Sequence, residues 1–118
     1  MINHPCTIWA RQTRANYLWL WRHAYALCKE YTRRYGKVHK MESMLMDELY
    51  DPPVNITKAK LTPFAQAMPE QYQHENAVVA YRQYYINEKV RFARWSYSEE
   101  PEWWAAKVAE VVEEPLPF

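Results

Sequence analysis

The chain has 118 residues, enough for one domain that buries roughly two thirds of its unfolded surface. A single Gly beside eight Pro argues against a turn-rich β protein and excludes the glycine-rich loops that cradle nucleotide phosphates. The net charge of +1 is polarised: residues 1–40 hold eight Lys/Arg and one acid, Glu30, whereas the remainder holds seven Lys/Arg and thirteen Asp/Glu. We predict an all-α fold, a compact four- or five-helix domain over residues 1–114.

The first forty residues predict two helices. Asn3-His4-Pro5 is typical of a cap with Pro at the first helical position, so a short helix should cover residues 6–11. Thr13 should cap the main helix, residues 14–35, and Gly36 should end it in the left-handed conformation. Its apolar positions recur at helical spacing and are expected to face the core: Tyr17, Leu20, Trp21, Ala24, Leu27, Cys28, Tyr31 and Tyr35.

A second helix is expected over residues 38–50, ending at Asp51-Pro52-Pro53, and Met41, Met44, Leu45 and Leu49 should be buried. Residues 51–73 read as an ordered, irregular Pro-rich connector. Its apolar residues should hold it against the core: Val54, Ile56, Leu61, Phe64 and Met68.

A third helix is expected over residues 75–95, packed on helix 14–35, with an apolar stripe of Val78, Tyr81, Tyr85, Phe92 and Trp95. Ser98 and the acids after it indicate the start of a last helix, residues 101–114. Its buried edge should be Trp104, Val108, Val111 and Val112, and residues 115–118 should form a loose tail.

Cys6 and Cys28 fit a reducing cytosol, where both are expected to be buried and inert. No cysteine or histidine spacing indicates zinc, and no cofactor is expected. The chain lacks a long apolar run and a cleavable leader, so we expect a cytoplasmic protein without a membrane partner.

The stretch RRYGKVHK, residues 33–40, is the strongest candidate site. Its cations, beside Tyr31 and Tyr35, are the residue types that neutralise phosphates and stack on bases. Cations in a last helical turn also offset the helix dipole, and Glu42, Asp47 and Glu48 are near enough in sequence to pair with them, so both interpretations stay open. The candidate nucleic-acid-binding residues are Arg33, Arg34, Lys37 and Lys40, with Arg14, Arg22, Arg91 and Arg94 as secondary contributors.

For three weaker patterns we prefer a structural role to a role in binding or catalysis. His39 and Glu42 are more typical of a surface ion pair than of a metal site, and His23 of a half-buried packing residue; His4 and His74 fit helix starts. The run from Tyr81 to Tyr85 can bind a base and a phosphate, but core anchors whose hydroxyls reach the connector are favoured, with Arg82 buried on loop carbonyls. No catalytic residue and no metal ligand is identified.

Several strings of the chain resemble the C-terminal part of a family of small proteins frequent in tailed bacteriophages. These strings are NHPCTIWARQTRANYLWLWRHAYALCKEYTRRYGKVHK, PP.NI, AMP, YRQYY, EK and PEWW, and the likeness covers roughly residues 3–104. It implies a phage or prophage origin, action in the host cytoplasm, and for some members a setting of DNA metabolism or modification. Longer members carry an N-terminal segment ahead of NHP that this chain lacks, and the part from residue 99 onward looks like an addition of its own.

The expected function is therefore that of a small phage accessory protein that binds nucleic acid, independently of sequence, or a nucleic-acid-handling complex. The alternative is a protein-interaction module, an inhibitor of a host factor or a structural subunit. It would use the acidic last helix and an exposed aromatic anchor: Trp103, Glu99, Glu100 and Glu102. A DNA-modification enzyme ranks third, and homo-oligomerisation is left open.

Overall fold

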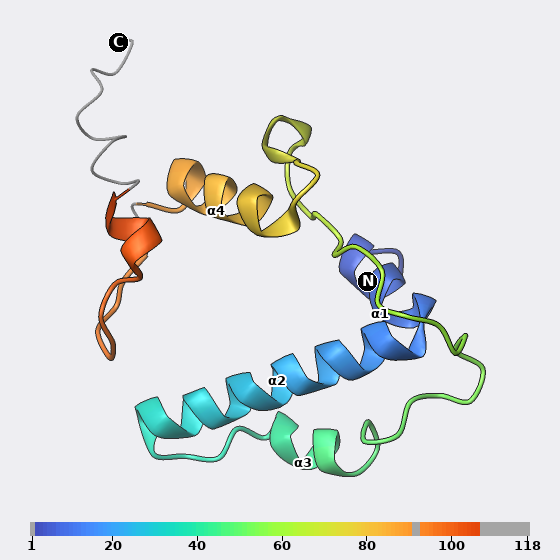
Figure 1. Ribbon diagram of the computed structural model, residues 1–118. Helices are drawn as coiled ribbons and strands as arrows, with labels where there is room; N and C mark the ends of the chain where they lie inside the picture. The colour runs from blue at the N-terminus through green and yellow to red at the C-terminus, as the bar shows by residue number, and fades with distance from the viewer. Residues whose placement is uncertain (1, 91–92, 107–118) are drawn as a thin grey trace. The chain divides into compact units, whose positions relative to one another are not determined.

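The computed structural model describes residues 2–90 and 93–106, and helices are the only regular elements of these residues (Figure 1). The predicted all-α class is confirmed. The chain divides into two compact units, Met1–Ala65 and Gln66–Phe118. No helix in the described part is long and apolar enough to cross a membrane.

The first unit begins with two helices that meet at Thr13. Helix α1 spans Pro5–Gln12 with His4 as its cap, and α2 spans Arg14–Tyr35. The Thr13 side chain accepts a hydrogen bond from the Asn16 amide, and Gly36 ends α2 at φ 66°, so the predicted caps are confirmed.

The second predicted helix is shorter than expected, since α3 covers only Met41–Met46. Carbonyls in this region bond to side chains of α2 rather than continuing the helical ladder. Tyr17 Oη donates to the Leu49 carbonyl and Trp21 Nε1 to the Leu45 carbonyl, each at 2.8 Å. The pKa of Tyr17 is raised above its ordinary value, mainly by burial and to a smaller extent by the Asp51 carboxylate. After Met46 the backbone forms turns instead of helix: the Leu49 amide donates to the Met44 carbonyl at 3.0 Å and the Tyr50 amide to the Asp47 carbonyl at 3.4 Å.

The connector returns to the first two helices (Figure 1). The Arg14 amide donates to the Thr57 carbonyl at 2.9 Å, and Trp9 Nε1 to the Thr62 carbonyl at 3.3 Å. Phe64 packs against Trp9, with ring centroids 5.3 Å apart. Residues 57–64 of the connector are therefore held against the helices, although Val54 is fully exposed rather than packed. Residues 70–72, expected to be irregular, form a short 3₁₀ helix.

The second unit contains a 3₁₀ helix, η1, over Glu70–Tyr72, and helix α4 over Ala77–Glu88. The Asn76 side chain caps α4 by accepting from the amides of Val78 and Val79. Helix α4 therefore begins later than the predicted residue 75, and it ends before the predicted residue 95. Residues 102–106 are helical, starting one residue after predicted position 101. The rest of the expected last helix, with Val108, Val111 and Val112, and the expected tail lie outside the described residues, as does Phe92.

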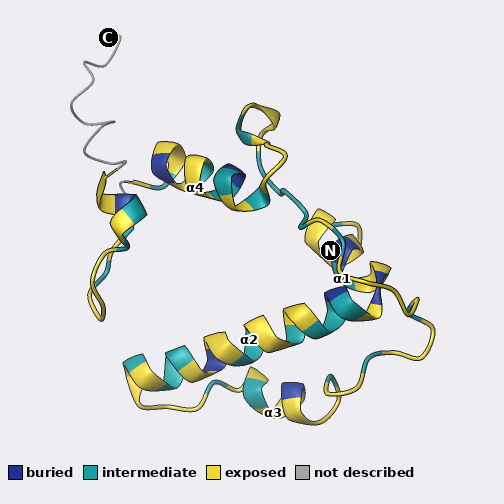
Figure 2. Ribbon diagram, in the orientation of Figure 1, coloured by how far each residue is buried: buried dark blue, intermediate teal, exposed yellow. Residues whose placement is uncertain are grey.

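Burial follows the predicted apolar positions only in part (Figure 2). The buried apolar residues of the described chain are Trp9, Cys28, Leu45, Ala80, Ile86 and Trp104. Positions expected in the core that are instead exposed are Leu20, Leu27, Tyr35, Met41, Met44, Leu61, Val78 and Tyr85. Helical spacing identified a face of each helix, but which face is covered depends on contacts distant in sequence. The expected packing of helix 14–35 on helix 75–95 stays a prediction, because these helices belong to different units.

Candidate nucleic-acid interface

The last turn of α2 holds two arginines around one carboxylate. Arg33 Nε donates to Glu30 Oε2 at 3.0 Å, and Arg34 Nε to Glu30 Oε1 at 2.8 Å. Hydrogen bonds from Arg33 and then Arg34 lower the pKa of Glu30 to about 2, so the carboxylate stays ionised. The same carboxylate raises the pKa of Arg33. The formal charges of these three groups sum to +1.

Lys37 and Lys40, beyond Gly36, extend this charge into the loop before α3. Both are exposed, and within the described residues no Asp or Glu lies within ion-pair distance of either. Glu42 pairs instead with Lys29 at 3.0 Å, the hydrogen bond raising the pKa of Lys29. The basic elbow, defined as Arg33, Arg34, Lys37 and Lys40, is thus only partly neutralised by its described surroundings.

Aromatic rings flank the basic elbow. Tyr31 packs against Tyr35 and, edge to face, against His39, with both centroid distances 4.9 Å. The Tyr35 ring is 52% exposed. His39 Nδ1 accepts from the Met41 amide at 3.1 Å. The expected ion pair between His39 and Glu42 is not found in the described part of the chain, where Glu42 pairs with Lys29. His39 instead satisfies the start of α3.

Three secondary candidates are exposed. Arg14 and Arg22 lie on α2, and at about 100° per residue they share with Arg33 an arc roughly 100° wide. This arc leads along α2 to the basic elbow. Arg94 is exposed in the second unit, and Arg91 lies outside the described residues.

The residues of the alternative partner surface are arranged differently from the prediction. Glu99, Glu100 and Glu102 are exposed, but Trp103 is only partly so. The Arg82 guanidinium lies 4.8 Å from the centre of its ring, and Trp104 packs edge to face at 6.0 Å. Trp103 is therefore not an open anchor, and Arg82, itself exposed, is stacked on a ring rather than buried on carbonyls.

Of the tyrosines from Tyr81 to Tyr85, which were expected to be core residues with hydroxyls that reach the connector, Tyr81 makes such a contact. The Tyr81 hydroxyl accepts from the Ala67 amide at 3.3 Å, as expected for a ring whose hydroxyl reaches the connector. Tyr84 packs against Tyr72 at 5.5 Å, whereas Tyr85 is exposed. His74 Nδ1 accepts from the Asn76 amide, confirming its place before the helix.

Cysteine and histidine positions need two corrections. Cys28 is buried, but Cys6 is exposed in the first turn of α1. His23 is exposed rather than half-buried and stacks on Trp19. Among the described residues, no group of three or more His, Cys, Asp or Glu side chains is placed to hold a metal ion.

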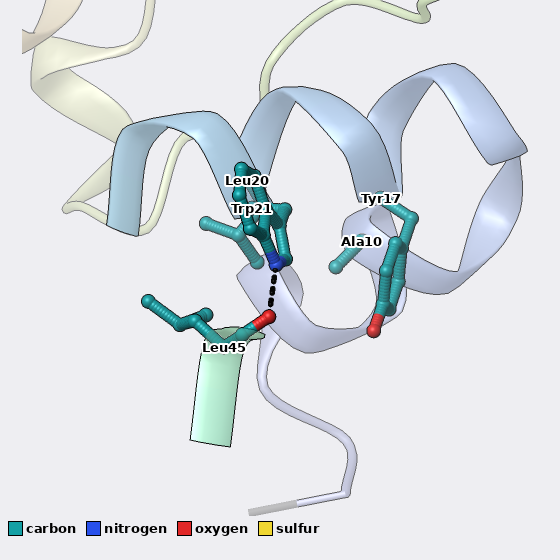
Figure 3. A pocket seen from close by; sticks show the side chains of 5 residues that line it. All are labelled: Ala10, Tyr17, Leu20, Trp21 and Leu45. Carbon is teal, nitrogen blue, oxygen red and sulfur yellow. Dashed lines mark hydrogen bonds between the residues drawn. The ribbon is translucent and has the colours of Figure 1, made fainter. Parts of the chain in front are cut away.

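A small apolar pocket of about 120 Å³ opens where the three helices of the first unit meet (Figure 3). Trp21, which lines the pocket, donates from Nε1 to the Leu45 carbonyl, and the Tyr17 hydroxyl donates to the Leu49 carbonyl. The polar groups of these rings are therefore used within the fold. The pocket is lined by Ala10, Tyr17, Leu20, Trp21 and Leu45.

Sequence reasoning missed the ring pair of Trp19 and His23. The signal was present, because rings four residues apart on a helix lie one above the other. It was overlooked because Trp19 falls outside the apolar stripe of α2. The buried Asn16 was missed for a different reason, since a polar residue inside a helix carries no local sign of burial.

No family model matches the chain, and no curated protein or solved structure shows significant similarity to it.

Proposed function

We propose that this chain is a small phage accessory protein that binds nucleic acid, independently of base sequence, through the basic elbow. The observation that carries the proposal is the pair Lys37 and Lys40, both exposed just beyond the end of α2. Cations in such a place attract phosphates and release the counterions condensed on nucleic acid. The resemblance to phage proteins found with DNA metabolism agrees with this proposal.

The distribution of charge between the units supports it. The first unit has ten Lys/Arg and five Asp/Glu, a net +5, and the second has five against nine, a net −4. Within the described part of the first unit, Glu30 and Glu42 form ion pairs with Arg33, Arg34 and Lys29. A positive first unit is the arrangement that steers a polyanion toward the basic elbow.

A gel shift with non-specific DNA tests the proposal. We expect binding at low salt that weakens as salt rises, with log K falling by about 0.9 per log unit of salt for each phosphate contact. Replacing Lys37 and Lys40 by Gln should weaken binding and reduce this slope. Arg33 and Arg34 are left intact first, because replacing them would uncover the Glu30 carboxylate.

The matched control is Lys58→Gln with Lys60→Gln. These lysines are exposed on the connector of the same unit, so the pair removes the same net charge elsewhere. A larger loss for the elbow variant supports the proposal. Absence of binding at low salt, or equal losses for the two variants, overturns it.

A further inference from the structure

Two stacked rings stand on an exposed part of α2. The indole of Trp19 and the imidazole of His23 are nearly parallel, at 10°, with centroids 5.1 Å apart. Trp19 is held from elsewhere by Phe64 at 4.7 Å and by the buried Trp9 at 5.8 Å. The inner ring is therefore fixed by the core of the first unit, and His23 is the outer ring.

The outer face of His23 is available to another ring. Its inner face is used by Trp19, the side chain is exposed, and among the described residues Trp19 is its only ring partner. One helical turn further on, Leu27 is 58% exposed and adds apolar surface on the same face of α2. A flat, apolar group placed on His23 would continue an existing stack.

This face is continuous with the basic elbow. At 1.5 Å per residue, Arg34 lies about 16 Å along the axis of α2 from His23, and at about 100° per residue it lies almost in line with it. Arg22 is also exposed, about 100° around α2 from His23 and on the same arc as Arg14 and Arg33. Stacking surface and cations thus follow one another along a single helix, the combination typical of single-strand binding.

The geometry points to a single-stranded nucleic acid as the ligand, with one unpaired base stacked on the outer face of His23 and the phosphates that follow held by the basic elbow. This inference rests on the function proposed above and adds to it a preference for unpaired strands. Bases inside a duplex have both faces covered by their neighbours, so they cannot stack on His23 without being flipped out.

The test compares an oligothymidine strand with a duplex of equal length in fluorescence anisotropy, with the full chain. We expect the wild type to bind the strand more tightly. His23→Gln removes the ring but still covers Trp19, and it should weaken strand binding roughly five- to hundredfold while changing duplex binding little. His23→Tyr, which restores an outer ring, should regain strand binding.

Val54→Gln is the control, since it changes a fully exposed side chain of the same unit, and circular dichroism checks that each variant remains helical. Failure of this inference can be distinguished from failure of the proposed function. Equal binding of strand and duplex, both insensitive to His23→Gln, overturns the stacking inference alone. Absence of binding to either nucleic acid overturns both.

Discussion

Asn16 and Thr62, 46 residues apart in sequence, bind each other through two hydrogen bonds. Asn16 Nδ2 donates to Thr62 Oγ1 at 2.7 Å, and the Thr62 amide donates to Asn16 Oδ1 at 3.0 Å. Asn16 Nδ2 also donates to the Trp9 carbonyl at 2.8 Å. Through these three bonds one amide side chain joins α1, α2 and the connector. Asn16 is 0% exposed.

We therefore expect Asn16→Leu to be among the most destabilising substitutions in the first unit. It would leave the Thr62 amide and the Trp9 carbonyl without their partner, at a cost of about 2–4 kcal/mol in the free energy of unfolding. Urea denaturation measures the loss. Asn55→Leu, at an exposed connector position, should change stability by less than about 0.5 kcal/mol. Equal effects of the two variants would contradict the role of Asn16.

Gly36→Ala should destabilise the chain by about 1–2 kcal/mol, because Gly36 has φ 66° and an L side chain is strained there. Apart from Gly36 and its chain neighbours, no residue has an atom within 4 Å of the position that a Cβ would take, so the cost comes from the backbone conformation and not from a clash with the surroundings. Gly36→Asn should cost less, since Asn tolerates the left-handed region better. Thermal unfolding compares the three proteins, and an Ala variant as stable as the wild type would disprove this account.

The Glu30 carboxyl should titrate with a pKa near 2 in the folded chain, because Arg33 and Arg34 stabilise its ionised form. Since this value lies below the ordinary 4.5, the stabilising contribution is present above pH 4.5 and is lost as the pH falls toward 2. A ¹³C NMR titration measures the pKa. Arg33→Gln should raise it, whereas Lys29→Gln, which removes the partner of Glu42, should leave it unchanged.

Glu30→Gln should strengthen nucleic-acid binding several-fold at low salt, because it removes the negative charge shared by Arg33 and Arg34. The effect should fade as salt rises. Glu70→Gln makes the same change of net charge at an exposed site of the second unit. Gel shifts on both variants decide the matter: equal gains would mean that net charge, and not the basic elbow, sets the affinity.

The bounds of α2 were predictable because they depend on local chemistry. Thr13 accepts from an amide three residues ahead, and Gly36 is the one residue type that enters the left-handed region without strain. The arginine pairs with Glu30 are also local, at spacings of three and four residues.

The end of α3 and the burial of Asn16 were not predictable in this way. Trp21 takes the Leu45 carbonyl across 24 residues, and Asn16 reaches Thr62 across 46. No local sequence pattern around Leu45 or Asn16 predicts these bonds, because the partner of each residue is distant in the sequence. For the candidate site, the types of charge were readable from the sequence, whereas the pairing of Glu42 with Lys29, 13 residues away, required the fold.

The connector also sets the order in which the first unit is completed during synthesis. The Arg14 amide, the Trp9 indole and the Asn16 side chain each have a hydrogen-bond partner in residues 57–62. Helices α1 and α2 therefore emerge from the ribosome before the connector groups that bind them, and until then α2 must persist on local hydrogen bonds, its caps and the bond from Asn16 to the Trp9 carbonyl. We expect that a nascent chain ending before residue 57 holds α2 but leaves the junction at Thr13 open to amide exchange, and that the junction becomes protected only once Thr62 has emerged.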